Sequence, residues 1–228
     1  MRLLGTLINV GAVIAGSMVG TFFHARLPRR FTTVAFQGIG LFTLFIGFTM
    51  AAKTKSLLVL VFSIVLGAIT GELLDIDRLL NRFGEWLKAR LQLGGERFAE
   101  GLVTAFLLFC MGSMTVLGAI EEGLGGRPNL LVAKSVLDGF ASLALASSLG
   151  IGVLFSVIPL FIYQGGLTLL AGSLHAVLSN TVVGEVSAAG GLILIGLGIT
   201  ILEIKQLKVL NMLPALVFAG VLAAVFLR

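Results

Sequence analysis

The stretch VAKSVLDGFASLALASSLG, residues 132–150, decides the class of fold. Apart from Lys134 and Asp138 it contains apolar and small side chains, and a helix of about 20 such residues crosses a hydrocarbon core about 30 Å thick. Charges are rare in such helices, because a charge at the bilayer centre costs about 2.5–3.5 kcal/mol on insertion scales. The stretch therefore predicts a transmembrane helix that carries a polar site.

Similar apolar runs recur along the chain, which has 228 residues, is 57% hydrophobic and 12% charged, and has a mean hydropathy of +1.10. We predict an all-α fold, a polytopic transmembrane helical bundle forming one domain over residues 1–228. Between residues 150 and 190, Pro159 and the pair Gly165–Gly166 predict a broken or re-entrant helix, so seven and eight spans remain alternatives. The eight-span interpretation places the helices at about residues 3–23, 31–52, 56–73, 99–120, 129–150, 152–175, 187–204 and 210–227.

The basic residues set the orientation of this bundle. With eight spans, the loops on one side contain Arg26, Arg29, Arg30, Arg78, Arg82, Lys88, Arg90, Arg97, Lys205 and Lys208, and the other side has five Lys and Arg. The positive-inside rule then places both termini outside the cytoplasm. Because the charges lie in short loops, we expect no nucleic-acid partner despite the net charge of +5.

The longest connector, residues 74–98, has apolar residues on one helical stripe and charged residues on the opposite one. We predict an amphipathic helix lying at the cytoplasmic interface. An anchor and a partner-docking helix are the two alternatives for its role.

Small residues at every fourth position predict close helix packing through Gly16 and Gly20 in the first span and Gly67 and Gly71 in the third. Two segment pairs are also similar: GLFTLFIGFT (40–49) with GLILIGLGIT (191–200), and IAGSM (14–18) with LAGSL (170–174). In eight spans these segments run in opposite directions. They indicate an inverted repeat of spans one to three and six to eight, with chance similarity as the alternative.

The polar residues inside the spans are the candidate site. Lys134 and Asp138 are one helical turn apart and can form an ion pair, and Ser135 belongs to the same helix. We expect this pair to contact an ion or substrate, or to act as a structural clasp between helices. Four further polar residues would line a path to it: Asn9, Gln37, Tyr163 and Gln164.

Enzymatic motifs are missing: the sequence has no H-E-x-x-H, G-x-S-x-G, P-loop or dinucleotide-binding motif. We therefore expect a protein that is not an enzyme and has no cofactor. His24 and His175 have no second ligand at suitable spacing, so we expect no metal site.

Four segments resemble a known family. FLLFCMGSMTVLGAI (106–120), KSVLDG (134–139), YQGGLTLLAG (163–172) and GELLDID (71–77) are similar to the prokaryotic membrane family called domain of unknown function 554. The resemblance covers nearly the whole chain and implies a multi-span protein of the inner membrane of bacteria or archaea, sometimes described as a possible transporter. It implies no catalytic or binding residues.

From these observations we expect a small membrane transporter or channel-like permease for a monovalent cation or small polar solute. Asp138 would bind the cation, and Lys134 would neutralise it when the site is empty. The alternative is a non-transporting oligomeric scaffold or interaction protein. In both cases the lipid bilayer is a partner, and a homodimer is expected because exposed glycine stripes favour self-association.

Overall fold

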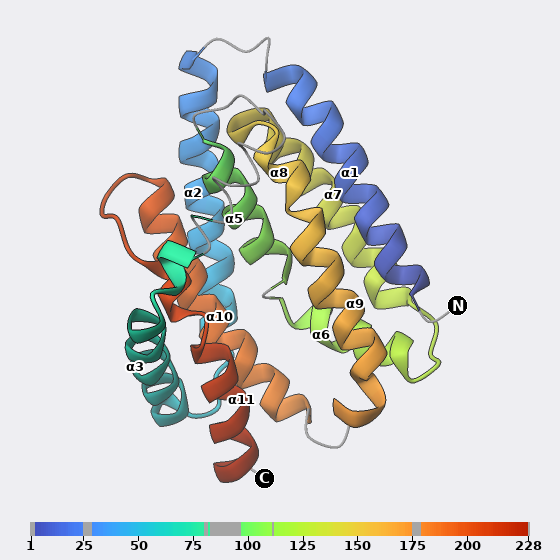
Figure 1. Cartoon of the computed structure of the whole chain (residues 1–228), viewed down its shortest axis with the longest axis vertical. Helices are drawn as coiled ribbons and strands as arrows, with labels where there is room; N and C mark the ends of the chain where they lie inside the picture. Colours follow the sequence, from blue (N-terminus) through green and yellow to red (C-terminus); the bar gives the residue numbers. More distant parts are fainter. Residues whose placement is uncertain are drawn as a thin grey trace. The chain divides into compact units, whose positions relative to one another are not determined.

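The computed structural model describes residues 3–24, 29–79, 82, 97–110, 112–174 and 179–227 (Figure 1). These residues form α-helices and one short 3-10 helix, and no strand occurs among them. Six of the helices are long and apolar enough to cross a membrane. A bent pair of helices adds a seventh span if the pair is counted as one span. The prediction of an all-α polytopic bundle is confirmed.

Most helices coincide with predicted spans. They are α1 (Leu4–His24), α2 (Arg29–Ala51), α3 (Leu57–Leu74) and α7 (Asn129–Leu149). Helix α10 (Asn180–Ile201) begins earlier than residue 187, because the side chain of Ser179 accepts a hydrogen bond from the Val182 amide at 3.3 Å and caps the helix. A polar segment that looked like a loop is therefore helical.

Between residues 150 and 190 the helix is broken at Ser156, near Pro159, but it continues through Gly165–Gly166. These glycines lie inside α9 (Val157–Leu174), which follows the short α8 (Gly152–Phe155) after a turn at Ser156. Pro159 is tolerated because it lies in the first turn of α9, where backbone amides have no intrahelical acceptor. The sharply bent pair is instead α5 (Phe98–Cys110) and α6 (Ser113–Gly123), inclined at 63°.

The helices group into two compact units, each built from distant parts of the sequence. The first unit contains α1, α5, α6, α7, α8, α9 and the beginning of α2. The second contains the rest of α2 from Gln37, α3, α10, the 3-10 helix η1 (Val209–Met212) and α11 (Ala215–Phe226). The expected single domain stays a prediction.

In the first unit, α1 packs side by side with α7 (Figure 1). A Cβ atom added to Gly16 would overlap the Gly139 carbonyl oxygen, and one added to Gly20 would lie 2.8 Å from the Cβ of Ala146. The contacts advance together along both helices, so α1 and α7 run parallel. Glycine is required here because the two backbones approach too closely for any side chain.

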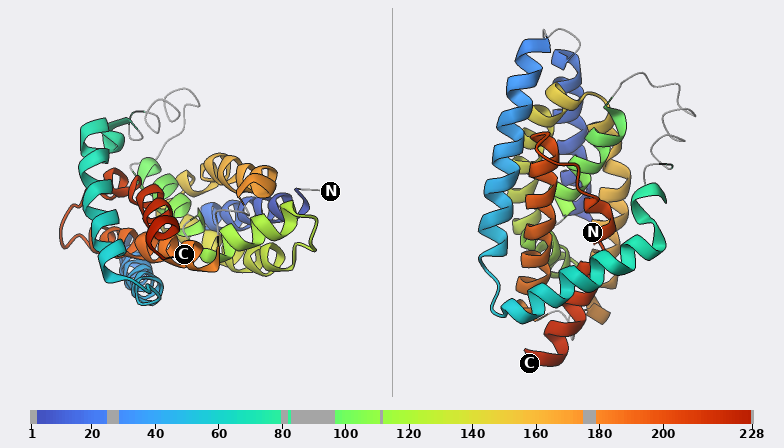
Figure 2. Two further views of the ribbon diagram at one scale, coloured as in Figure 1. Left: turned by 90° about the horizontal axis from the view of Figure 1, so that it is seen from below. Right: turned by 90° about the vertical axis from the view of Figure 1, so that its left-hand side faces the viewer.

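In the second unit, α3 packs against α11 (Figure 2). A Cβ atom on Gly67 would lie 2.5 Å from the Cβ of Ala215, and one on Gly71 would overlap the Asn211 carbonyl oxygen. These two helices run antiparallel. All four glycines of the predicted stripes therefore contact helices of the same chain.

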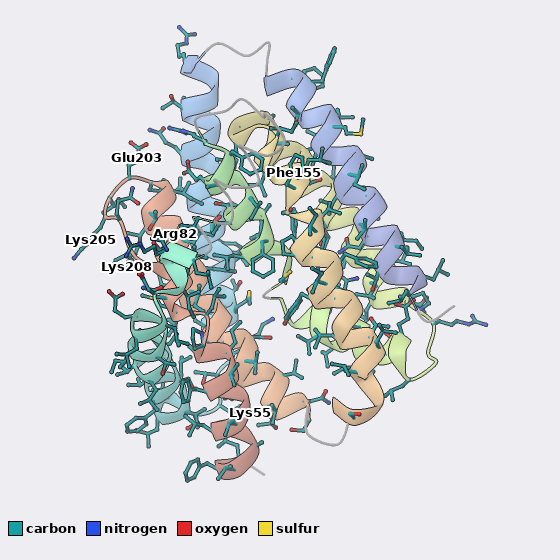
Figure 3. All side chains as sticks on the ribbon, viewed as in Figure 1. Lys55, Arg82, Phe155, Glu203, Lys205 and Lys208 are labelled. Carbon is teal, nitrogen blue, oxygen red and sulfur yellow. The ribbon has the colours of Figure 1, made fainter. Side chains whose placement is uncertain are left out.

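The GELLDID segment ends α3 with a polar clamp. The side-chain amide of Asn211 donates to Glu72 at 2.6 Å, and its carbonyl oxygen accepts from the Asp77 amide at 2.6 Å. Lys208, which lies between α10 and η1 (Figure 3), also donates to Glu72. This hydrogen bond and the carboxylate charge raise the pKa of Lys208. Of the predicted amphipathic connector, only residues 74–79, 82, 97 and 98 are described, so the prediction largely concerns residues outside the described part.

Candidate functional site

The candidate site begins with a buried ion pair on α7. Lys134 and Asp138 are one turn apart, their side chains are 6% and 10% exposed, and the Lys134 ammonium contacts Oδ2 of Asp138. The ammonium also lies 5.9 Å from the centre of the Phe109 ring on α5, a distance suited to a cation–π contact. Both charged groups are therefore held inside the bundle and do not extend to its surface.

Side-chain amides from two other helices complete the site. Nδ2 of Asn9, on α1, donates to Oδ2 of Asp138 and to Oε1 of Gln164, each at 3.0 Å. Nε2 of Gln164, on α9, donates in turn to the Thr6 hydroxyl at 3.3 Å. We call these five residues, Thr6, Asn9, Lys134, Asp138 and Gln164, the polar cluster. It joins α1, α7 and α9 of the first unit.

The structure brings together four of the residues predicted from the sequence, Asn9, Lys134, Asp138 and Gln164, and leaves three apart. Ser135 is buried, and its hydroxyl donates to the Leu131 carbonyl of its own helix at 2.6 Å. Tyr163 is partly buried on α9. Gln37 is exposed on α2 and belongs to the second unit. Thr6 was missed, although it lies three residues before Asn9 and thus on the same helical face.

A buried carboxylate, Glu122, lies near the polar cluster. The span predicted at residues 99–120 does not include it, but the structure places it in the last turn of α6, where it is 2% exposed. Its Oε1 accepts from the backbone amide of Gly5, at the start of α1, at 2.7 Å. Its Oε2 is buried and has no hydrogen-bond partner among the described residues, and the same holds for Oδ1 of Asn9.

A second buried carboxylate, Glu185, lies in the other unit and was not singled out from the sequence. It is 1% exposed and accepts from the Thr54 hydroxyl at 2.6 Å and from the amides of Lys55 and Ser56 at 2.5 and 3.2 Å. Lys55 lies in the loop between α2 and α3 (Figure 3). Glu185 lies on α10, and both of its oxygens accept hydrogen bonds from this loop. It therefore holds the loop against α10 and caps the beginning of α3.

Comparison with known proteins places this bundle in a family. Residues 4–224 match the family described as "Protein of unknown function (DUF554)". The chain belongs to this family. The resemblance seen in the sequence is thereby confirmed over nearly the whole length of the chain.

Two relatives align over almost their entire length. "Uncharacterized membrane protein YdfK" of Bacillus subtilis (strain 168) is 30% identical over 227 residues, which cover 96% of this chain and 95% of that protein. "Uncharacterized protein YqgA" of Escherichia coli (strain K12) is 34% identical over 226 residues, which cover 97% and 96%. No solved structure matches the chain. The name of YdfK, a membrane protein, agrees with the polytopic membrane architecture described above.

Proposed function

We propose that this protein is a small transporter or channel-like permease for a monovalent cation or a small polar solute. The observation that carries the proposal is the buried Lys134–Asp138 pair, tied to Asn9 and Gln164 on two other helices. Desolvating two charges costs several kcal/mol per ion, and apolar residues would pack such a bundle at less cost. Ionisable groups placed inside a membrane bundle usually mark an ion or substrate path.

In this proposal Asp138 binds the cation and Lys134 replaces it when it leaves. Oδ2 of Asp138 already contacts both the Lys134 ammonium and the Asn9 amide. An arriving cation therefore competes with Lys134 for one carboxylate, which makes binding reversible. Asn9 and Gln164 line the path beside the pair, and Ser135 and Tyr163, on the same helices as Lys134 and Gln164, are proposed to line it further away.

The proposed inverted repeat is supported by the boundaries of helices in the second unit. A shift of 151 residues, which aligns GLFTLFIGFT with GLILIGLGIT, carries residue 40 to 191. The same shift carries Ala51, the end of α2, to residue 202, and α10 ends at Ile201. It carries α3 (57–74) to 208–225, where η1 and α11 occupy 209–226. The end of α2 thus corresponds to the end of α10, and the limits of α3 correspond to those of the η1–α11 segment, which is interrupted at Leu213–Pro214.

The contacts between α2 and α10 support the same correspondence. A Cβ atom on Gly47 would meet the Gly191 carbonyl oxygen at 2.7 Å and the side chain of residue 195 at 2.8 Å. A Cβ atom on Gly198, the counterpart of Gly47, would meet the Gly40 carbonyl oxygen at 3.1 Å and the side chain of residue 44 at 2.7 Å. The residues met by one glycine are thus the shifted counterparts of the residues met by the other.

An inverted repeat supports a transporter because two related halves can exchange conformations and open a site alternately to each side. In such proteins the site lies at the interface between the repeats. The polar cluster fits this rule, since Asn9 and Gln164 lie on α1 and α9, the first and sixth spans that the repeat would relate. We accordingly propose an inner-membrane location with both termini outside the cytoplasm.

Flux through reconstituted liposomes tests this function. We expect the purified protein to carry one of Na⁺, K⁺, Li⁺ or a small polar solute, and Asp138→Asn to reduce the flux at least about tenfold, since one lost charge-assisted contact of 1.4 kcal/mol corresponds to that factor. Asp75→Asn is the matched control, because this aspartate is exposed at the end of α3 and its positive φ of 51° suits asparagine. Unchanged flux in Asp138→Asn would show that Asp138 is not the binding carboxylate.

The scaffold alternative gains less support. It relied on exposed glycine stripes, but Gly16, Gly20, Gly67 and Gly71 pack within the chain. A homodimer remains part of our proposal, although a second copy would have to bind another face. Native mass spectrometry of the detergent-solubilised protein gives the oligomeric state, and a monomer would remove the dimer from the proposal.

A further inference from the structure

We infer that Glu122 is a second cation-binding carboxylate, from which a monovalent cation passes along α1 to Asp138. The inference rests on the proposed function and extends its path toward the loop that follows α6. It assigns a role in binding to a residue that lies outside the polar cluster.

Helix geometry places Glu122 beside that cluster. Its Oε1 is held 2.7 Å from the Gly5 amide, and Gly5 lies one turn before Asn9 on the same face of α1. Four residues of helix correspond to a rise of about 6 Å. Thr6 lies between them and accepts from Gln164. Polar oxygen atoms therefore follow one another along the buried face of α1, from Glu122 to Asp138.

Two acceptors on this face have no donor among the residues that the structure describes. Oε2 of Glu122 and Oδ1 of Asn9 are both buried and unpartnered among the described residues, and these side chains are 2% and 0% exposed. Buried polar atoms are almost always satisfied, and a buried carboxylate needs a positive charge nearby. If Glu122 only caps α1, the hydrogen bond from Gly5 to its Oε1 is explained, but its Oε2 is left without a partner among the described residues. A cation is a suitable partner for either oxygen as it moves along this face.

The charge of the site indicates a monovalent ion. One cation of charge +1 neutralises Glu122, whereas a divalent ion is usually held by several carboxylates. Glu121 also has a buried Oε2 without a partner among the described residues, but its side chain begins toward the loop after α6, since a Cβ atom added to Gly126 would lie 2.9 Å from its Cγ. In the described part of the chain, no three His, Cys, Asp or Glu residues gather to hold a metal ion.

Glu185 provides the matched comparison. It is as deeply buried as Glu122, and it also accepts from backbone amides at the beginning of a helix. Its two oxygens, however, are filled by Thr54, Lys55 and Ser56. Loss of its charge should therefore weaken the fold without changing the response to cations.

Thermal unfolding of the full detergent-purified chain in Na⁺, K⁺ or Li⁺, against N-methyl-D-glucamine at the same ionic strength and pH, tests the inference. We expect one metal cation to raise the Tm by about 5 °C, because a ligand that binds only the native state stabilises it. Glu122→Gln should lose this rise, and Glu185→Gln should keep it despite a lower starting Tm. The glutamine retains an oxygen for the Gly5 amide, so the fold should persist.

The inference is overturned if no cation shifts the wild-type Tm, or if Glu122→Gln keeps the full shift. Should Glu122→Gln fail to fold, Glu122→Asp replaces it. An unchanged Tm shift with an unchanged order of ions in Glu122→Asp overturns the inference.

Measurements of flux distinguish the Glu122 site from the proposed transport function. If Asp138→Asn loses flux while Glu122→Gln keeps both its flux and its Tm shift, Glu122 is not a cation site and the transport proposal is retained. If the wild-type protein shows a cation-dependent Tm shift but no flux, and Glu122→Gln loses that shift, the Glu122 site is supported and the transport function is rejected.

Discussion

Asn9 donates a hydrogen bond to Asp138 at 3.0 Å and thereby links α1 to α7 across 129 residues of sequence. The two helices pack in parallel through Gly16 and Gly20, so the backbones are close enough for this short amide to reach the carboxylate. Glycine packing and the polar cluster therefore depend on each other. A change in either should be detectable in the other.

The ion pair can be tested as a clasp or as a site. Lys134→Met leaves Asp138 buried without its counter-charge and should lower the free energy of unfolding by about 3–5 kcal/mol. The double variant Lys134→Met/Asp138→Leu removes both charges and should recover most of that loss. Thermal unfolding measures stability, and liposome flux measures function. We expect the double variant to be folded but inactive, and retained flux would identify the pair as a clasp.

Asn9→Ala removes the donor shared by Asp138 and Gln164. It should cost about 1–3 kcal/mol, because Oε1 of Gln164 is left buried without its hydrogen bond. Ser135→Ala is the control, since the Ser135 hydroxyl donates only to a carbonyl of its own helix, and it should cost less than about 0.5 kcal/mol. Equal losses in the two variants would contradict a special role for Asn9.

Apolar length and charge spacing were sufficient to predict most helices, because a membrane requires about 20 apolar residues per span. They failed where local capping or tertiary packing decides the structure. Gly165 could not be recognised as part of a continuous helix, since its place beside Thr6 depends on residues far away in sequence. The beginning of α10 was missed because a polar segment capped by Ser179 resembles a loop.

The candidate site was predictable only in part, for a related reason. Lys134 and Asp138 are separated by one helical turn, so their pairing follows from sequence alone. Glu122 and Glu185 precede or follow glycine-rich and polar segments, where a carboxylate is usually solvated. Their burial depends on Gly5 and on the loop after α2, which only the folded chain brings near.

The glycine contacts predict opposite effects at two positions of α1. Gly16→Ala places a Cβ atom against the Gly139 carbonyl and should cost about 1–3 kcal/mol of stability. At Gly11 no atom lies within 4 Å of an added Cβ, so Gly11→Ala should stabilise by up to about 1 kcal/mol. Thermal unfolding of the two variants measures these changes in stability. Equal Tm values would mean that α1 does not pack closely on α7.

Labelling of introduced cysteines tests the orientation. Cys110 is buried and should not react, so Lys53→Cys and Lys205→Cys, both at exposed positions, report on the two ends of the bundle. We expect an impermeant maleimide added to intact cells to label residue 53 and to spare residue 205 until the membrane is opened. The reverse pattern would invert the topology, and labelling of both positions would exclude eight spans.

The proposed repeat predicts that counterpart substitutions have matched effects. Gly47→Ala and Gly198→Ala each push a Cβ atom toward a glycine carbonyl and an aliphatic side chain of the opposite helix. Their losses in stability should therefore agree within about 0.5 kcal/mol, each being about 1–3 kcal/mol. Gly184→Ala, on α10 with no atom within 4 Å of the added Cβ, is the control and should be nearly neutral. If one variant unfolds the protein while its counterpart is silent, α2 and α10 do not occupy equivalent places. Equal losses would instead support two interchangeable halves, the symmetry on which alternating access depends.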